Sequence, residues 1–411
     1  MLLRKLSICF AAAALSVCAQ DAAPADTRAG QIEAARQAKA AAIQPEKPAS
    51  LVGKSESIFS KAFKVWNVSR VGEHGLSLRL GGLPDGSGLA LGPDYVFKMG
   101  ELYNPDLIWD SYVVGSLQGY YRAQTGIELP RLLNEHAFVS ATAFRFDFPR
   151  LAYYGEGPDT RETGRTDYRM QENQVGVRGG FRLSHSLRAG AEGSFQSIDI
   201  RRGTAPGIAQ TASTYQIPVV EGQARNANFF LGGFFLQYDS RDAPLNPRAG
   251  TYLSAEFQNV NGNPSRLGEF NRYDLEAQQY FHFWNKRRVI AARVKSSLTT
   301  PHAGSGVPFY LEPSLGGSSD LRGFRPYRFY DRNSVVATVE YRWTVMQVLD
   351  MALFGDAGKV YHDASTFSLT HMQTDIGLGL RAKVGDNVPF RIDIGCSREG
   401  VQVWLNFYNV F

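Results

Sequence analysis

The sequence contains residue types that can support catalysis, but not in the patterns that catalysis requires. The serine-hydrolase pattern G-x-S-x-G and the zinc-binding pattern H-E-x-x-H are both absent, and the seven histidines are dispersed along the chain. A lipase built from a lone Ser and a lone His is the enzymatic alternative that remains. We therefore predict that the chain is not an enzyme and has no catalytic residue, no metal site and no cofactor.

One chemically distinctive stretch combines acidic and basic side chains with turn-forming residues. Asp239, Arg241 and Asp242 are followed closely by Pro247 and Gly250. Aspartate carboxylates accept hydrogen bonds from nearby backbone N–H groups, and Pro and Gly favour turns. This turn motif therefore predicts a capped turn rather than a reactive site.

A second distinctive stretch sets an arginine among glycines, in the order Leu315-Gly-Gly-Ser-Ser-Asp-Leu-Arg-Gly-Phe324. The Arg322 guanidinium carries five N–H donors in a fixed fork, a geometry that suits carboxylates. Whether it finds such partners depends on the elements that position it.

Composition narrows the class of protein to which those elements belong. The 411 residues include 41 Gly, 26 Phe and 19 Tyr, without an apolar run long enough for a membrane-spanning helix. A transmembrane barrel shows no such run, because it alternates lipid-facing and lumen-facing residues. The formal net charge of +5 comes from scattered side chains, and the absence of a Lys/Arg block argues against nucleic-acid binding.

The first twenty residues predict export. Two basic residues precede the apolar segment 6–15, and Val17-Cys-Ala19 resembles a small-residue cleavage site. We expect residues 1–19 to be a signal peptide, with lipidation at Cys18 as the alternative. Residues 20–57 are rich in Ala, Gln, Arg and Glu, which predicts a periplasmic leader that is disordered or forms a short helix.

From about residue 74 onward, apolar and polar residues alternate with a period of two, as in strands that have one apolar face. Segments 273–283, 334–343, 374–382 and 390–396 show this pattern. The last strand places five apolar side chains on one face: Val401, Val403, Leu405, Phe407 and Phe411. Residues 58–411 are therefore expected to form a single all-β unit.

A soluble β-sandwich also alternates, so three further features decide between the two folds. The strands are about ten residues long, which suits a tilted membrane crossing. Short connections alternate with long ones, namely 149–167, 200–226, 301–332 and 362–372. Aromatic residues cluster near strand ends, as an interfacial girdle requires. The girdle candidates are Trp109, Tyr112, Tyr120, Tyr121, Phe283, Trp284 and Trp343. These features favour a transmembrane antiparallel β-barrel.

Counting the alternating segments gives the expected size of the barrel. Fifteen segments follow residue 74, and one of them is 108–122. Single-chain bacterial barrels close with an even number of strands, so we predict sixteen. Phe59–Val68 is the best candidate for the missing strand, with a helix over residues 58–69 as the alternative. Phe411 is expected to be an assembly signal.

Several motifs follow one another in a distinctive order. The stretch 315–324 precedes Asn333–Trp343 and Phe354-Gly-Asp-Ala-Gly358. Upstream come Gly86-Ser-Gly-Leu-Ala-Leu-Gly92, Tyr154-Gly-Glu-Gly157 and the turn motif. This order resembles the BamA/TamA superfamily of outer-membrane assembly factors, also called the bacterial surface antigen family. The resemblance covers the chain from about residue 75 to its end, and it depends on order and spacing rather than on any one motif.

The resemblance implies that loop 301–332 folds back into the lumen with three residues at its tip: Arg322, Gly323 and Phe324. It also implies that Glu340 and Asp356 on the lumen wall are the acidic partners of this arginine. An arginine carried into a lumen loses part of its hydration and so needs carboxylates. The alternative is a surface arginine on a mobile loop.

The chain departs from this family at its N-terminal side. The best-known members carry periplasmic POTRA domains before the barrel, and the leader expected here is too short for one. We therefore expect a POTRA-less relative that aids outer-membrane protein or lipid biogenesis, by local bilayer perturbation or through a weak lateral seam. A passive pore gated by loop 301–332 is the alternative. The expected location is the bacterial outer membrane. The expected partners are outer-membrane lipid and, during biogenesis, the barrel-assembly machinery. A separate periplasmic chain is left open as a third partner.

Overall fold

The structure is a computed structural model that describes residues 75–101, 104–215, 227–263, 268–284, 286–346, 348–384 and 387–407. The predicted signal peptide, the leader and the segment 59–68 lie outside these residues, as does Phe411. No helix within the described ranges is both long and apolar enough to cross a bilayer.

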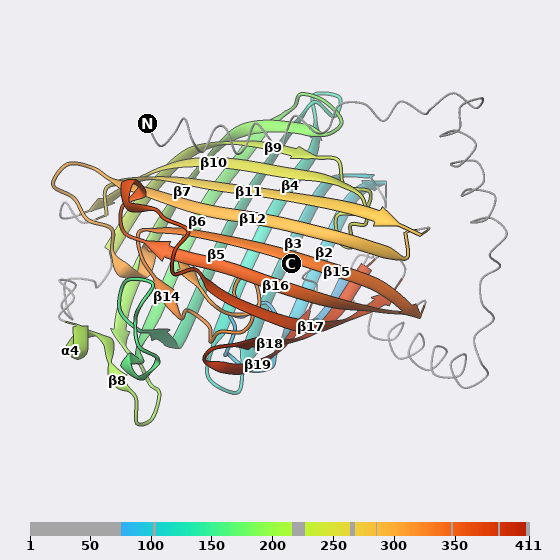
Figure 1. The fold of residues 1–411 in the computed structure, drawn as a ribbon. Helices are drawn as coiled ribbons and strands as arrows, with labels where there is room; N and C mark the ends of the chain where they lie inside the picture. The colour runs from blue at the N-terminus through green and yellow to red at the C-terminus, as the bar shows by residue number, and fades with distance from the viewer. Residues whose placement is uncertain are drawn as a thin grey trace.

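Sixteen of the described strands pair in chain order, each antiparallel to the next, and wrap into a barrel (Figure 1). Their bounds are β1 (Gly75–Leu80), β2 (Ala90–Glu101), β3 (Asn104–Ser116), β4 (Tyr121–Leu132), β5 (Ala137–Tyr153), β6 (Thr166–Arg182), β7 (Leu187–Arg202), β9 (Ala227–Asp239), β10 (Gly250–Asn263), β11 (Phe270–Phe283), β12 (Arg288–Pro301), β15 (Asn333–Met346), β16 (Leu349–Tyr361), β17 (Gln373–Val384), β18 (Asn387–Ser397) and β19 (Gly400–Phe407). The predicted all-β transmembrane antiparallel barrel of sixteen strands is confirmed.

Short elements decorate the connections between these strands. The two-residue strand β8 (Ala209–Gln210) pairs in parallel with β6 and leads into the helix α4 (Thr211–Tyr215). Strands β13 (Ser314–Leu315) and β14 (Phe329–Tyr330) pair with each other inside the loop between β12 and β15. Single 3-10 turns cover Glu162–Gly164, Phe309–Leu311 and Ala364–Thr366.

The strand β4 is one that the sequence prediction did not separate from its neighbour. The predicted strand 108–122 consists of most of β3, a short turn and the first residues of β4. The remainder of β4 carries a weak alternation signal, because Gly126 and Pro130 interrupt it and a bulge shifts its register near its end. The count of sixteen is thus reached without residues 59–68.

The outward face of the barrel is apolar, as contact with lipid requires. Val401, Val403 and Leu405 of β19 are 60, 65 and 51% exposed, and Ile376 of β17 is 68% exposed. The intervening positions point into the barrel, where charged side chains such as Asp393 are fully buried. The predicted alternation along these strands therefore separates a lipid-facing side from a lumen-facing side.

Two of the predicted girdle residues face the lumen instead. Tyr112 is buried beneath the guanidinium of Arg79, which lies 3.6 Å from its ring centroid. Tyr120 is buried against Phe148, with ring centroids 5.9 Å apart. Trp109, which has the opposite parity on β3 to Tyr112, is 41% exposed and faces outward as predicted. An aromatic residue near a strand end can therefore be assigned to the membrane interface only when it is known that its side chain points outward from the barrel.

The two ends of the barrel differ in the length of their connections. The long connections, which follow β5, β7, β12 and β16, gather at one end, here called the loop end (Figure 1). The opposite turn end has short turns after β4, β6, β11 and β15. Barrels of this class carry their longer loops on the outer side of the membrane, so the loop end is the predicted outer end.

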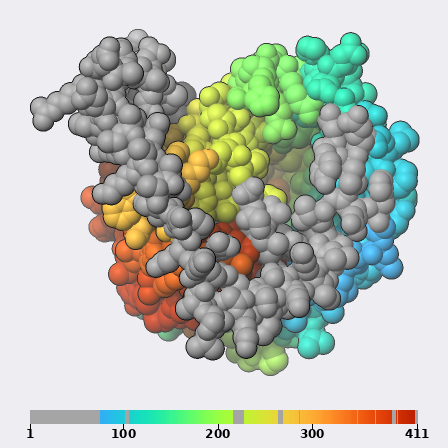
Figure 2. All heavy atoms as spheres, turned by 90° about the vertical axis from the view of Figure 1, so that its right-hand side faces the viewer, coloured from blue at the N-terminus to red at the C-terminus, as the bar shows by residue number. Residues whose placement is uncertain are grey.

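The first and last strands meet at a junction here called the seam. Seen from the turn end, the strands run around the rim in chain order, from blue through green and yellow to red (Figure 2). Within the described residues β1 and β19 are the shortest of the sixteen, with 6 and 8 residues. A Cβ atom on Gly81 would lie 3.3 Å from the Phe407 Cβ atom, so the chain just after β1 contacts the end of β19.

Candidate functional site

The loop between β12 and β15, residues 302–332, enters the lumen from the loop end. The β13–β14 pair joins its two arms, and residues 316–325 between the arms form a tip. Leu321 and Phe324 of the tip are fully buried, and Arg322 is 3% exposed. Such burial, together with contacts to the lumen faces of β15 to β19, places the tip inside the barrel.

Arg322 is bound by the two wall carboxylates named from the sequence. Its Nε and Nη2 atoms donate to the two oxygens of Asp356 at 2.8 and 2.9 Å, and its Nη1 donates to Glu340. The guanidinium also stacks on the Phe354 ring, 3.5 Å from the ring centroid. Burial lowers the pKa of Arg322, but Glu340, Asp356 and Asp393 outweigh it and raise the pKa above its ordinary value.

Strand register explains why these two carboxylates converge. Asp356 of β16 lies opposite Thr338 of β15, and Glu340 follows two residues later on the same face. Gly358, again two residues along from Asp356, leaves room for the loop. A Cβ atom there would lie 3.1 Å from a methyl carbon of Leu315.

Further charges surround the tip and complete a buried network. Arg342 and Arg381 donate to Glu340 at 2.7 and 3.1 Å. Asp393 binds Arg381 at 2.6 Å and Arg391 at 2.7 Å. Charges buried this closely must compensate one another, so each guanidinium here depends on the carboxylates that it shares. The sequence places these residues on lumen faces but gives no sign of which ones pair.

The tip backbone is held as closely as its arginine. The Trp404 indole Nε1 donates to the Arg322 carbonyl at 2.6 Å, and the Ser397 hydroxyl donates to the Gly323 carbonyl at 2.7 Å. A Cβ atom on Gly395 of β18 would lie 2.5 Å from the Arg322 carbonyl carbon. Glycine at this wall position is therefore what allows the tip to seat.

Phe324, the third tip residue, anchors an apolar cluster beside the charges. Its ring meets the edge of Phe329 at a centroid distance of 5.2 Å. The cluster consists of Leu315, Leu321, Phe324, Phe329, Val336 and Val360. Burial of these side chains supplies a stabilising contribution that is independent of the ion pairs.

The loop between β1 and β2 is tied to the tip through Asp85. Its carboxylate accepts hydrogen bonds from the backbone N–H and the hydroxyl of Ser318, at 2.5 and 2.9 Å. Burial raises the pKa of Asp85, although the bonds from Ser318 oppose this. The Ser318 carbonyl accepts from Arg391 at 2.8 Å. The tip therefore connects the first hairpin to β18, across the seam.

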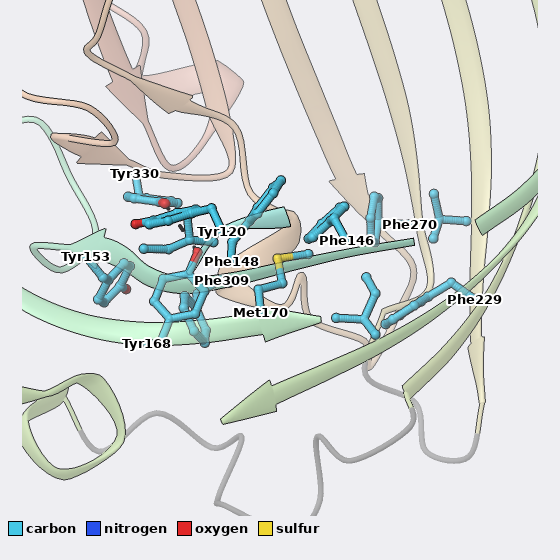
Figure 3. Packing of buried hydrophobic residues seen from close by; sticks show 13 residues of the cluster. Tyr120, Phe146, Phe148, Tyr153, Tyr168, Met170, Phe229, Phe270, Phe309 and Tyr330 are labelled. Atoms are coloured by element: carbon cyan, nitrogen blue, oxygen red, sulfur yellow. Dashed lines mark hydrogen bonds between the residues drawn. The ribbon is translucent and has the colours of Figure 1, made fainter. Parts of the chain in front are cut away.

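At the loop end, aromatic and aliphatic side chains fill the lumen in place of polar ones (Figure 3). The buried members of this aromatic cluster are Tyr120, Phe146, Phe148, Leu151, Tyr153, Tyr168, Met170, Ile198, Phe229, Val260, Phe270, Phe309 and Tyr330. Phe309 of the loop lies 4.9 Å from Tyr153 and 5.0 Å from Tyr168, measured between ring centroids. The cluster packs against the root of the loop, and it lines this part of the lumen with apolar side chains.

Arg328 clamps the root of the loop to two other loops. It is 1% exposed, and its Nε lies 2.8 Å from Glu399 in the turn between β18 and β19. Its Nη1 and Nη2 atoms donate to the Thr160 hydroxyl and carbonyl at 2.7 and 2.6 Å. Nothing in the sequence distinguishes this arginine from its neighbours, because both partners lie far away along the chain.

Glu312 makes the root of the loop sensitive to pH. It is 8% exposed, one of its oxygens has no hydrogen-bond partner, and burial together with Glu156 and Asp331 raises its pKa to about 9, against opposition from Arg332 and Arg272. The folded loop therefore retains a proton that the unfolded chain has released. The resulting stability is complete below the unfolded pKa of 4.5 and is lost as the pH rises toward 9.

We expect Glu312→Gln to weaken this dependence, because the amide needs no proton to remain neutral. The measurement is the thermal unfolding midpoint of the wild type and the variant between about pH 5 and pH 9. The midpoint of the wild type should fall over this range by more than that of the variant. Parallel pH profiles would contradict the assignment.

The turn motif folds as a capped turn at the turn end. The Asp239 carboxylate accepts from the backbone N–H of Arg241 at 3.1 Å and from its guanidinium at 2.8 Å. Asp242 accepts from the backbone N–H of Arg248 at 2.9 Å. Gly250 has a positive φ of 101°, and a Cβ atom there would lie 2.3 Å from a carbonyl oxygen. Pro247 is buried in the same turn. The residues of the turn motif therefore stabilise the turn.

Comparisons with known proteins agree with this architecture. The Omp85 superfamily domain matches residues 114–407. The crystal structure of BamA from Haemophilus ducreyi lacking POTRA domains 1–3 aligns with a TM-score of 0.58 and 14% identity, covering 81% of this chain and 69% of that chain. CdiB from Escherichia coli aligns with a TM-score of 0.53 and 13% identity, covering 80% and 61%. No curated protein sequence matches the chain.

At these identities the two solved structures support the fold alone. The family match carries more weight, because it spans well over half of the chain and includes the loop, its tip and the strands that bind it. The resemblance predicted from the order of the motifs is confirmed, and the chain belongs to the Omp85 superfamily.

Proposed function

We propose that this chain resides in the bacterial outer membrane and aids the biogenesis of outer-membrane proteins or lipids there, acting at the seam between β1 and β19. The observation that supports this proposal is that the tip of the long loop contacts the strands on both sides of the seam. The tip of loop 302–332 binds β18 and β19 on one side and, through Asp85, the first hairpin on the other. A loop that holds both edges of a barrel can control how tightly those edges meet.

The surroundings of the seam support this role. A cavity of 730 Å³ lies beside it, lined by residues 81–90, by the tip of the long loop and by residues 403–407 of β19. Among the described residues, β1 forms a backbone ladder with β2 and β19 forms one with β18, and no ladder joins β1 to β19. Separation of β1 from β19 would therefore break no ladder of backbone hydrogen bonds among these residues, whereas separation of any other neighbouring pair would break one.

The N-terminal assignments belong to the same proposal. Residues 1–19 would direct export, 20–57 would form the periplasmic leader and 58–411 would form the barrel. The barrel-assembly machinery would read Phe411 during biogenesis. A separate periplasmic chain would be a further partner.

A passive pore is the second candidate, and one observation favours it. A cavity of 310 Å³ lies within the barrel, and its lining includes the polar side chains of Gln174, Arg178, Glu192 and Gln258. The aromatic cluster at the loop end opposes this function, because apolar side chains that line the lumen disfavour the passage of hydrated ions.

Conductance in planar bilayers separates the two functions. With the loop seated and the aromatic cluster closed, the wild-type barrel should give small, flickering currents. A passive pore would instead give large and steady currents. Large, steady currents from the wild type would overturn the assembly function in favour of the pore.

A further inference from the structure

Strands β5, β6 and β7 invert their amphipathic pattern partway along their length. Toward the turn end, Val139 of β5 and Val175 and Val177 of β6 point outward and are 38, 59 and 53% exposed. Toward the loop end, Phe146 and Phe148 of β5 point inward into the aromatic cluster. Apolar side chains face outward only where hydrocarbon surrounds the barrel. The inversion therefore marks where these strands leave the membrane.

Beyond the inversion, the outward face carries a belt of charges. Asp147 accepts two hydrogen bonds from the Arg169 guanidinium, at 2.5 and 2.8 Å. Arg201 donates to Asp199 at 2.6 and 2.8 Å, and the ladder places it opposite Arg169. Arg145 is the member of this belt on β5 that lies nearest the turn end. The belt therefore begins at Arg145, at the edge of the hydrocarbon.

A groove of 520 Å³ lies next to this arginine, on the outward surface of the barrel. It follows a row of residues in which each lies opposite the next: Tyr95, Ser111, Thr125, Ala143 and Val175. The side chains in the middle of this row are small, so the surface is hollow there. The hydroxyls of Ser111 and Thr125 bond to each other at 2.6 Å, and the lining is almost entirely apolar.

Arg145 lies at the edge of the groove, and not all of its five guanidinium N–H donors are bonded to the protein. Its Nε donates to the Tyr121 hydroxyl at 3.1 Å and its Nη1 donates to the Asn173 amide oxygen at 2.8 Å. Both partners are neutral, and no carboxylate among the described residues forms an ion pair with this guanidinium. Asp147, the next outward residue on β5, is already bound by Arg169. Asp147 stabilises the positive charge of Arg145 only by a longer-range interaction, without an ion pair, so the guanidinium can still bind an anionic ligand.

We infer that this groove binds a phosphorylated lipid of the outer leaflet, with an acyl chain along the row of small side chains and a phosphate on Arg145. An apolar groove fits a hydrocarbon chain, and a guanidinium fork suits phosphate oxygens. The two features adjoin at the edge of the hydrocarbon, where an anionic lipid carries its phosphate. Bisphosphorylated lipid A has this chemistry. The site lies on the outward face, so it does not depend on the function proposed for the seam.

Native mass spectrometry of the full chain in detergent, with bisphosphorylated lipid A added, tests this site. Because Arg145 would donate charge-assisted hydrogen bonds to the phosphate, Arg145→Ala should weaken binding about tenfold or more. Ala143→Phe should weaken it similarly by filling the groove, whereas Arg145→Lys should retain part of the affinity. The matched controls are Arg201→Ala, an arginine of the same belt outside the groove, and Ala255→Phe, an outward position on β10. Both should bind like the wild type.

Two results would overturn the inference. One is equal binding of lipid A and its dephosphorylated form by the wild type. The other is wild-type affinity in both Arg145→Ala and Ala143→Phe. Faster gel migration of unheated than of heated samples verifies that each variant is folded. Arg145 is exposed, so its replacement removes no core contact.

Discussion

Replacing Arg322 with alanine is expected to release the long loop from the lumen while the barrel stays folded. Asp356 would lose the two guanidinium donors of this arginine, Nε and Nη2. Glu340 would lose one of its three guanidinium partners. Removing one member of a buried ion group costs about 3–5 kcal/mol. That is enough to shift a loop from docked to free.

The measurements are protease cleavage of loop 302–332 from the loop end and conductance in planar bilayers, both of which should rise. Arg322→Lys should restore only part of the docking, because one ammonium group cannot form the fork with Asp356 while also reaching Glu340. The matched control is Arg325→Ala in the same loop. Arg325 is 44% exposed and pairs with the exposed Glu162, a contact worth between about 0 and 1 kcal/mol. An Arg322→Ala variant no more sensitive than this control would show that the ion pairs do not hold the loop.

Gly395→Ala is expected to unseat the same tip without removing a single charge. The new Cβ atom would lie 2.5 Å from the carbonyl carbon and oxygen of Arg322 and 2.7 Å from the nitrogen of Gly323. These are backbone atoms that cannot rotate away, so the tip must retreat from β18. Its hydrogen bond from Trp404 and its fork with Asp356 would then lengthen. Overpacking of this kind typically costs about 1–3 kcal/mol.

Gly395→Ala should increase protease sensitivity and conductance, as Arg322→Ala does, but by a smaller amount. Gly232→Ala on β9 is the control, because a Cβ atom there would meet no atom within 4 Å. If Gly395→Ala behaved like Gly232→Ala, the tip would have room to spare, and its close fit against β18 would be wrong.

The strand pattern of this barrel could be predicted from the sequence because alternation is a local property. Most strands and their lipid-facing residues, such as those of β17 to β19, follow from it directly. β4 does not, because Gly126 and Pro130 break its alternation and only a short turn separates it from β3. The count of sixteen follows from the requirement for an even number, and β4 brings the described strands to that number.

The alternation along a strand also does not show which of its two faces points into the barrel. Phe146 and Phe148 alternate with Arg145 and Asp147 in the same period-two pattern as the membrane-spanning residues. Only the structure shows that the apolar side there points inward, into the aromatic cluster. The apolar cluster at the loop end could therefore not be predicted from the alternation.

The site was predictable in part. Arg322 and its partners Glu340 and Asp356 were named from the resemblance between motifs, since an arginine and carboxylates far apart in sequence carry no local signal of pairing. Arg381 and Asp393 could be assigned to the lumen face but not to each other, because pairing depends on cross-strand register. Arg328 and Asp85 bind residues of distant loops, which no pattern in the sequence predicts.

The most direct test of the central claim is a disulfide that closes the seam. Gly81→Cys and Phe407→Cys, with Cys396→Ser to remove the free thiol, place two Cβ atoms about 3.3 Å apart, close to disulfide geometry. A non-glycine residue at the positive φ of Gly81 costs about 1–2 kcal/mol. This cost is the same in the reduced and the oxidised protein, so it does not affect the comparison between them. The measurement is the rate at which liposomes containing this chain fold an unfolded outer-membrane barrel. We predict acceleration by the reduced protein and its loss on oxidation. Equal rates in the two states, or no acceleration by the reduced protein, would contradict a function at the seam.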